Sequence, residues 1–171
     1  MKTQIKKINS NKGIFLETLI NSSSAFLEAK EVCLIFKRQI PIQIVEKISN
    51  YYIKAKLNEK AYTDYYGCYK SKMFDFEAKQ TQNKDFMMNL IKKHQLNHII
   101  NCERFKIHSF LLIHFVLTND YFIINSTQLR KFIGKTKIEY EWIKQNCYEI
   151  ELIFPGILNF KDYLSFIFDR I

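Results

Sequence analysis

The sequence has few of the residues that interrupt regular structure, with four glycines and two prolines among 171 residues. This scarcity predicts helices and strands joined by short polar turns. Its cysteines stand far apart and form no C-x-x-C pair, which argues against a disulfide framework and favours small buried thiols: Cys33, Cys68, Cys102 and Cys147. No segment supplies the roughly 18 uninterrupted apolar residues of a membrane helix, so we expect no membrane partner.

The sequence also lacks familiar catalytic motifs. Gly134–Thr136 has none of the preceding glycines of a phosphate-binding loop, and no nucleophile–base pair is indicated. His94, His98 and Cys102 are spaced four apart, as metal ligands on one helix face are, and His108 is the nearest candidate for a fourth ligand. Residues so spaced on a helix also occur without a metal. The sequence predicts no metal site and no cofactor.

What the sequence does contain is apolar and basic. Hydrophobic residues make up 47% of the chain and aromatic residues 15%, which is ample for the core of one domain or of two small fused halves. The net charge of +9, from 26 basic and 17 acidic residues, indicates a partner rich in phosphate. The alternative is a basic subunit of a large assembly, or a codon bias toward lysine.

Apolar spacing in the first half predicts alternating helices and strands. A helix capped by Asn11 or Asn9 ends at the Ser22–Ser24 run, and a strand follows over residues 26–38. Pro41 suits the first turn of a second helix that reaches residue 55. A strand is expected over residues 68–78 and a helix over 83–101.

The second half is less uniform. Residues 105–117 have the apolarity of a strand or of a buried helix, and periodicity cannot separate the two. The sequence then predicts a short strand, a helical turn capped by Ser126, a hairpin and a last helix capped by Asn159, over residues 121–125, 127–133, 138–154 and 160–168. A helix-turn-helix over 127–143 is a weaker alternative to the hairpin.

Two eleven-residue stretches, Leu16–Phe26 and Leu112–Phe122, share one skeleton. Each has Leu, two variable residues, a large apolar residue, a β-branched residue, five mostly polar residues and Phe. Such a repeat indicates one pseudo-symmetric domain. Aligning the two copies favours a helix over residues 105–117.

These stretches resemble the LAGLIDADG homing-endonuclease family, whose motif is a helix that packs against its twin and carries an acid at its end. The apolar frame is kept in both copies, at Leu16, Leu19, Ile20 and Phe26 and at Leu112, Phe115, Val116 and Phe122. The resemblance implies an α+β fold, a pseudo-twofold duplicated αββαββα saddle. It divides a pseudo-dimeric monomer into a first half, residues 1–103, and a second, shortened half, residues 104–171.

The positions that carry the family's metal-binding carboxylates are neutral in this chain. They are Ser23 in the first copy and Asn119 in the second, and Asp120 stands one position too late. Hard cations require charged oxygen ligands. The resemblance therefore implies an inherited nuclease scaffold that is no longer an enzyme and has no catalytic residues.

The expected function is to bind RNA as a structural protein and not to cut it. We expect an inactive LAGLIDADG-like protein that binds ribosomal or intron RNA in the mitochondrial matrix, as a ribosomal protein or an intron-splicing helper with protein neighbours in a ribonucleoprotein. The amino-terminal residues, basic and free of acids until Glu17, agree with an organelle-encoded chain. The alternatives are a subunit of a large organelle assembly that contacts only protein, and an active homing endonuclease.

Basic residues on the expected first-half strands are the candidates for phosphate contacts: Lys30, Lys37, Arg38, Lys70 and Lys72. Tyr69 is the candidate for stacking on a base of single-stranded RNA. Each lysine has a solvated strand face as its alternative.

Overall fold

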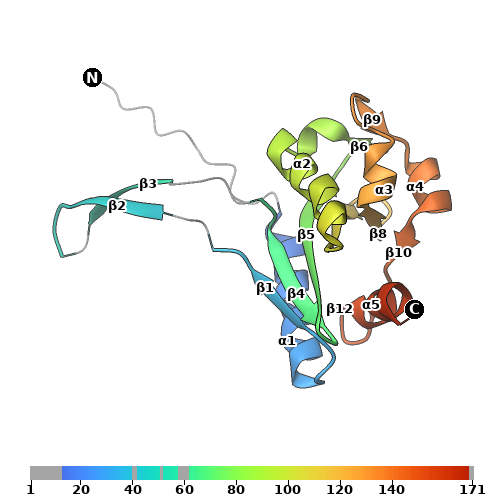
Figure 1. Cartoon of the computed structure of the whole chain (residues 1–171), viewed down its shortest axis with the longest axis horizontal. Coiled ribbons are helices and arrows are strands. Elements are labelled where there is room, and N and C mark those ends of the chain that lie inside the picture. The colour runs from blue at the N-terminus through green and yellow to red at the C-terminus, as the bar shows by residue number, and fades with distance from the viewer. Residues whose placement is uncertain (1–12, 40–41, 51, 58–61, 170–171) are drawn as a thin grey trace.

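A six-stranded mixed sheet with helices on both faces forms the body of the protein (Figure 1). The computed structural model describes residues 13–39, 42–50, 52–57 and 62–169, so Pro41 and the basic residues before Gly13 lie outside the described ranges. The strand order is β1-β4-β5-β7-β8-β10, with bounds Leu34–Lys37, Tyr65–Tyr69, Lys72–Thr81, His108–Phe115, Asp120–Asn125 and Tyr148–Glu149. Every neighbouring pair is antiparallel except β5 and β7, which are parallel.

Five helices and three small antiparallel strand pairs complete the described residues. The helices are α1 Ile14–Ala29, α2 Lys93–Cys102, α3 Ser126–Arg130, α4 Tyr140–Asn146 and α5 Phe160–Phe168, with short 3₁₀ turns at Met88–Leu90 and Glu103–Phe105. The pairs are β2 Ile42–Lys47 with β3 Ile53–Leu57, β6 Phe86–Met87 with β9 Lys137–Ile138, and β11 Leu152–Ile153 with β12 Ile157–Leu158. None of the described helices is both long and apolar enough to cross a membrane.

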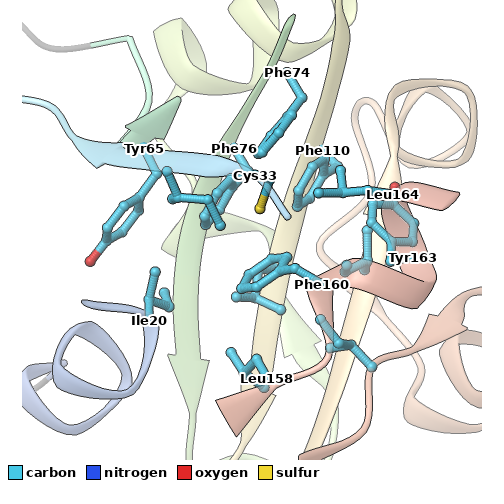
Figure 2. Close-up of a cluster of buried hydrophobic side chains, with 14 of the residues drawn as sticks. Ile20, Cys33, Tyr65, Phe74, Phe76, Phe110, Leu158, Phe160, Tyr163 and Leu164 are labelled. Atoms are coloured by element: carbon cyan, nitrogen blue, oxygen red, sulfur yellow. The ribbon is translucent and has the colours of Figure 1, made fainter. Parts of the chain in front are cut away.

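The sheet separates two hydrophobic cores. On one face, α1, α5 and β12 cover a cluster of stacked rings, in which Phe76 lies 4.9 Å from Phe110 and 5.0 Å from Tyr65 between ring centroids. Figure 2 shows Phe160 and Leu158 facing the same cluster. On the other face, α2, α3 and α4 pack on a second core around Phe122.

The expectation of a helix over residues 105–117 is wrong, because β7 occupies most of this segment. Phe110 and Leu112 enter the first core, whereas Leu111 and Ile113 enter the second. A strand covered on both faces is apolar throughout and shows no alternation. The prediction from the repeat alignment is wrong because a strand buried on both faces and a buried helix look alike in sequence.

The helix predicted over residues 41–55 is also replaced by strands. β2 and β3 form a hairpin that projects away from the body (Figure 1). Its side chains are exposed over residues 42–47 and 53–56, and many are β-branched, including Ile42, Ile44, Val45 and Ile53. Such residues lose rotamer freedom in a helix and fit a strand better.

The hairpin predicted over residues 138–154 is wrong as well. Residues 140–146 form α4, which buries Tyr140 and Ile143 at helical spacing, and only Tyr148–Glu149 joins the sheet. The expectations for β8 and for a last helix capped by Asn159 are confirmed. The Asn159 Oδ1 atom accepts a hydrogen bond from the Asp162 amide at 3.3 Å.

The duplicated saddle is wrong. Leu16–Phe26 lies within α1, but the second copy begins in β7, continues through a turn and ends in β8, so the copies form no helix pair. The single sheet contains strands from both sides of the predicted boundary between residues 103 and 104, and β5 and β7 pair across it. The coarse mixture of α and β elements remains, with a different topology.

The two neutral motif positions have structural contacts. Ser23 does not end its helix; its buried hydroxyl donates to the Leu19 carbonyl at 2.7 Å and accepts from the Leu158 amide at 2.9 Å, which ties α1 to β12. Asn119 adopts a left-handed conformation, with φ of 58°, in the turn between β7 and β8. Asn tolerates this conformation better than most residues.

Replacing Ser23 with Ala should leave the Leu158 amide without its acceptor. A buried unsatisfied donor costs about 1–3 kcal/mol, so we expect a loss of that size in the free energy of unfolding, measured by urea denaturation. Ser22→Ala, an exposed change one residue earlier on the same helix, is the matched control and should be close to neutral. Equal effects of the two changes would contradict the assigned contact.

Candidate functional site

Strand β5 has two chemically different faces. Phe74 and Phe76 enter the aromatic core, while Asp75, Glu77 and Lys79 point to the opposite face, at the two-residue spacing of a strand. On that face α2 lies against β5 through Gln95 and His98. A row of charged side chains is thus held inside the fold.

Glu77 is fully buried, and its two oxygens have different surroundings. Oε1 accepts a hydrogen bond from Gln95 Nε2 at 2.6 Å and pairs with Lys79 Nζ, whereas Oε2 has no partner among the described residues. Burial, with the nearby charge of Asp64, raises the pKa of Glu77 from 4.5 to about 7. The carboxylate is thus held in place through Oε1.

Asp64 brings a second carboxylate to the same place. It directly precedes β4, and its Oδ2 lies 4.0 Å from Lys79 Nζ and 3.4 Å from the Ala78 amide nitrogen. A cavity of about 310 Å³ opens here and is lined in part by Glu17, Asp64 and Lys79. Two acids and a lysine therefore line one solvent-accessible hollow at the end of β5, next to the buried Glu77 that pairs with the same lysine.

These residues fit a hard divalent cation. Glu77 Oε2 is buried and unpaired, Asp64 supplies a partly exposed carboxylate beside it, and all the donors are oxygen atoms. Oxygen ligands of this kind are those that Mg²⁺ prefers. Lys79 is placed to stabilise added negative charge at the same point.

A second polar network lies two residues earlier on β5. Asp75 Oδ2 is 2.6 Å from His98 Nε2 and 3.6 Å from Arg38 Nη2, and Asp75 Oδ1 accepts a hydrogen bond from Ser109. Cys102 Sγ lies 3.3 Å from the same His98 nitrogen. Asp75 joins this group in place of His94, which the sequence had offered.

The residues predicted to bind nucleic acid fall into two groups. Lys37 and Arg38 lie near the site: Lys37 Nζ is 2.6 Å from Glu17 Oε2, and the Arg38 guanidinium lies over the Tyr66 ring at 4.9 Å. Lys30 is exposed just after α1. The role of all three in binding stays a prediction.

Lys70 and Lys72 flank the tight turn between β4 and β5, at the opposite end of that hairpin from Asp64. Lys70 pairs with Asp169 at 2.8 Å, and the hydrogen bond to Asp169 raises the pKa of Lys70. Tyr69 is buried, and its hydroxyl donates to Asp169 at 2.9 Å. The structure therefore gives the Tyr69 ring a place in the core and no face for a base.

Asp64, Glu77 and Lys79 are not among the site residues predicted from the sequence. Two features of the sequence could have indicated them. Asp64 directly precedes one strand, and aromatic and charged residues alternate in the run Phe74–Lys79 on the next strand. Aromatic side chains on one face show that the strand is buried, and charges in such a strand are seldom incidental. The charges that stand out in the sequence of this segment are instead Lys70 and Lys72, which lie at the other end of the hairpin.

Comparison with solved structures identifies the fold class. The structure has the restriction-endonuclease-like fold and matches that of Hjc, a Holliday junction resolvase from the archaeon Archaeoglobus fulgidus. The match has a TM-score of 0.50 and 8% identity, over 78% of this chain and 94% of that one. At this identity the likeness shows the fold alone.

The sequence comparisons identify the family within that class. The model of the family Recombination protein U matches residues 11–166, and the chain belongs to this family. The Holliday junction resolvase RecU of Ureaplasma parvum is 42% identical over 160 residues, covering 92% of this chain and 94% of its own. The protein of the same name from Mycoplasmopsis pulmonis is 33% identical over 161 residues, covering 92% and 96%.

These findings correct the functional expectations. The chain is not a LAGLIDADG protein, since its family is Recombination protein U. Its relatives are named as resolvases, which are nucleases, so the prediction of an inactive RNA-binding scaffold in a ribosome or a splicing complex is wrong. Those relatives are bacterial proteins, and the mitochondrial location is wrong too.

The raised pKa of Glu77 predicts a pH-dependent stability for the metal-free protein. Between pH 4.5 and about 7 the folded carboxyl keeps a proton that the unfolded chain has lost, so this group lowers stability as pH rises through that window. Glu77→Gln should remove the penalty and stabilise the protein at pH 8 by on the order of 1–3 kcal/mol.

Urea denaturation in EDTA at pH 4 and pH 8 would measure this difference. At pH 4 the substitution should change little, because the carboxyl is protonated in both states. The exposed Glu28→Gln is the control and should show no such pH dependence. A destabilised Glu77→Gln protein at pH 8 would overturn the assignment.

Proposed function

We propose that this protein is a divalent-metal-dependent nuclease that cuts four-way DNA junctions. The observation that carries the proposal is the unpaired, buried Oε2 of Glu77, whose neighbours Asp64 and Lys79 line an open cavity. The choice of substrate is supported by relatives that carry the name Holliday junction resolvase and match the chain over nearly its whole length.

Each residue has a distinct part in the proposed reaction. Asp64 and Glu77 would hold the cation, which when bound activates water and stabilises the charge on the phosphate that is cut. Gln95 fixes the Glu77 carboxylate through its amide, so that Oε2 faces the ligand. Lys79 stabilises the negative charge that develops on the phosphate.

The β2–β3 hairpin is the proposed DNA contact nearest to this site. The chain leaves the body after Arg38 and returns at Asp64, and the Arg38 amide donates to the Asp64 carbonyl at 2.8 Å. The hairpin is therefore rooted beside the catalytic acid. It carries exposed Lys47, Lys54 and Lys56, which suit phosphate contacts.

Substitution of the site residues tests the nuclease. Asp64→Asn, Glu77→Gln and Lys79→Ala should each reduce Mg²⁺-dependent cleavage of a synthetic four-way junction by roughly 100-fold or more, because each removes an oriented charge from the reacting centre. Junction binding, measured by gel shift in Ca²⁺, should persist. Wild-type cleavage rates in these variants, or a wild-type protein that leaves junctions uncut, would refute the proposal.

A double substitution tests the hairpin. Lys47→Ala with Lys56→Ala should weaken junction binding and lower the slope of log affinity against log salt by up to about 2, since each lost phosphate contact contributes about 0.9. The control with the same charge change is Lys144→Ala with Lys161→Ala, on α4 and α5. Equal losses in both double variants would show that only net charge matters.

A further inference from the structure

The group formed by Asp75, His98 and Cys102 has the composition of a transition-metal site. One oxygen of Asp75, a ring nitrogen of His98 and the sulfur of Cys102 all lie within 4.8 Å of one another. His98 and Cys102 stand four apart on α2 and share one face of it, and Asp75 comes from β5 beneath. Asp75 and Cys102 are buried, whereas His98 is partly exposed.

Hydrogen bonds alone do not account for the close approach of these three side chains. His98 Nε2 faces both Asp75 Oδ2, at 2.6 Å, and Cys102 Sγ, at 3.3 Å. One imidazole nitrogen carries at most one hydrogen, so it cannot donate a well-directed bond to both atoms. A cation between the three atoms would satisfy all of them at once.

The surroundings of Asp75 support this role. Ser109 donates to Oδ1, which orients the carboxylate so that Oδ2 is directed toward His98. The Arg38 guanidinium also approaches Oδ2, at 3.6 Å, but it has other contacts: its Nε donates to Thr63 Oγ1 at 3.3 Å, and it lies over the Tyr66 ring. Arg38 can therefore keep its place when Oδ2 binds a metal.

The dimensions agree with tetrahedral zinc. Bonds of about 2.0 Å to nitrogen or oxygen and about 2.3 Å to sulfur place tetrahedral donors roughly 3.3–3.5 Å apart. His98 Nε2 lies 2.6 Å from Asp75 Oδ2 and 3.3 Å from Cys102 Sγ, and no two of the three donor atoms are more than 4.8 Å apart. Small side-chain rotations therefore suffice to bring the donors to tetrahedral separations. With three protein donors, a water molecule would be the fourth ligand, and the ring of His98 is held by Tyr62, which stacks on it at 5.0 Å.

We propose that Asp75, His98 and Cys102 bind a borderline-soft divalent cation, of which Zn²⁺ is the best fit, at a site separate from the one formed by Asp64 and Glu77. A nitrogen, sulfur and oxygen set of this kind selects zinc-like ions and disfavours Mg²⁺. The same chain thus offers a soft site and a hard site, two residues apart on one face of β5. This inference stands on its own geometry and does not require nuclease activity.

Binding at this site would fasten α2 to β5. His98 and Cys102 would be joined through the cation to Asp75, and Gln95, one turn earlier on α2, contacts Glu77. We therefore assign the cation a structural role, in which it fixes the helix that positions Gln95. Zn²⁺ should accordingly raise the melting temperature of the metal-free protein.

Cobalt titration of the full-length, metal-stripped protein tests the site, because Co²⁺ replaces Zn²⁺ and gives a thiolate-to-cobalt charge-transfer band when sulfur is a ligand. We expect one equivalent of Co²⁺ to produce this band, Zn²⁺ to abolish it, and excess Mg²⁺ to leave it unchanged. Cys102→Ser should lose the band. Cys33→Ser and Cys147→Ser, at cysteines outside the group, should keep it.

The nuclease site provides the second control. The double variant Asp64→Asn with Glu77→Gln should retain the charge-transfer band, although we expect it to cut no junctions. The inference is overturned if the wild-type protein gives no band with stoichiometric Co²⁺, or if the band survives in Cys102→Ser. The wild-type titration decides the question even if that variant fails to fold.

Discussion

The burial of one carboxylate, that of Glu77, is the constraint on which the described arrangement depends. An ionised group in this position needs partners, and Gln95 and Lys79 supply them from α2 and from the same strand. The Gln95 contact ties α2 to β5. The two faces of β5 are therefore specialised: stacked rings hold the strand from one side, and polar contacts hold the helix from the other.

The sequence allowed prediction of elements whose pattern is local. β8 and α5 were found because one has a short β-branched run and the other has an Asn159 cap with an amphipathic face. β7 was missed because its burial on both faces follows from the helices around it, which lie elsewhere in the sequence. In α4, tertiary packing of Tyr140 and Ile143 outweighed an apparent alternation.

The resemblance failed for a related reason. Its frame, a few large apolar residues at fixed intervals, is compatible with a helix at Leu16–Phe26 and with a strand, turn and strand at Leu112–Phe122. The neutral residues Ser23 and Asn119 were interpreted as lost acids. In the structure they satisfy a backbone amide and a left-handed turn, so their neutrality carries no information about catalysis. The acids of the site lie on β5 and just before β4.

The way the β2–β3 hairpin joins the body determines which part of this fold can vary. Within the part of the chain that the structure describes, a backbone hydrogen bond from the Arg38 amide to the Asp64 carbonyl closes the base of the hairpin. The position of Asp64 is thereby decoupled from the length and composition of everything between the two residues. The hairpin can therefore be shortened, extended or replaced while Asp64 keeps its place in the fold.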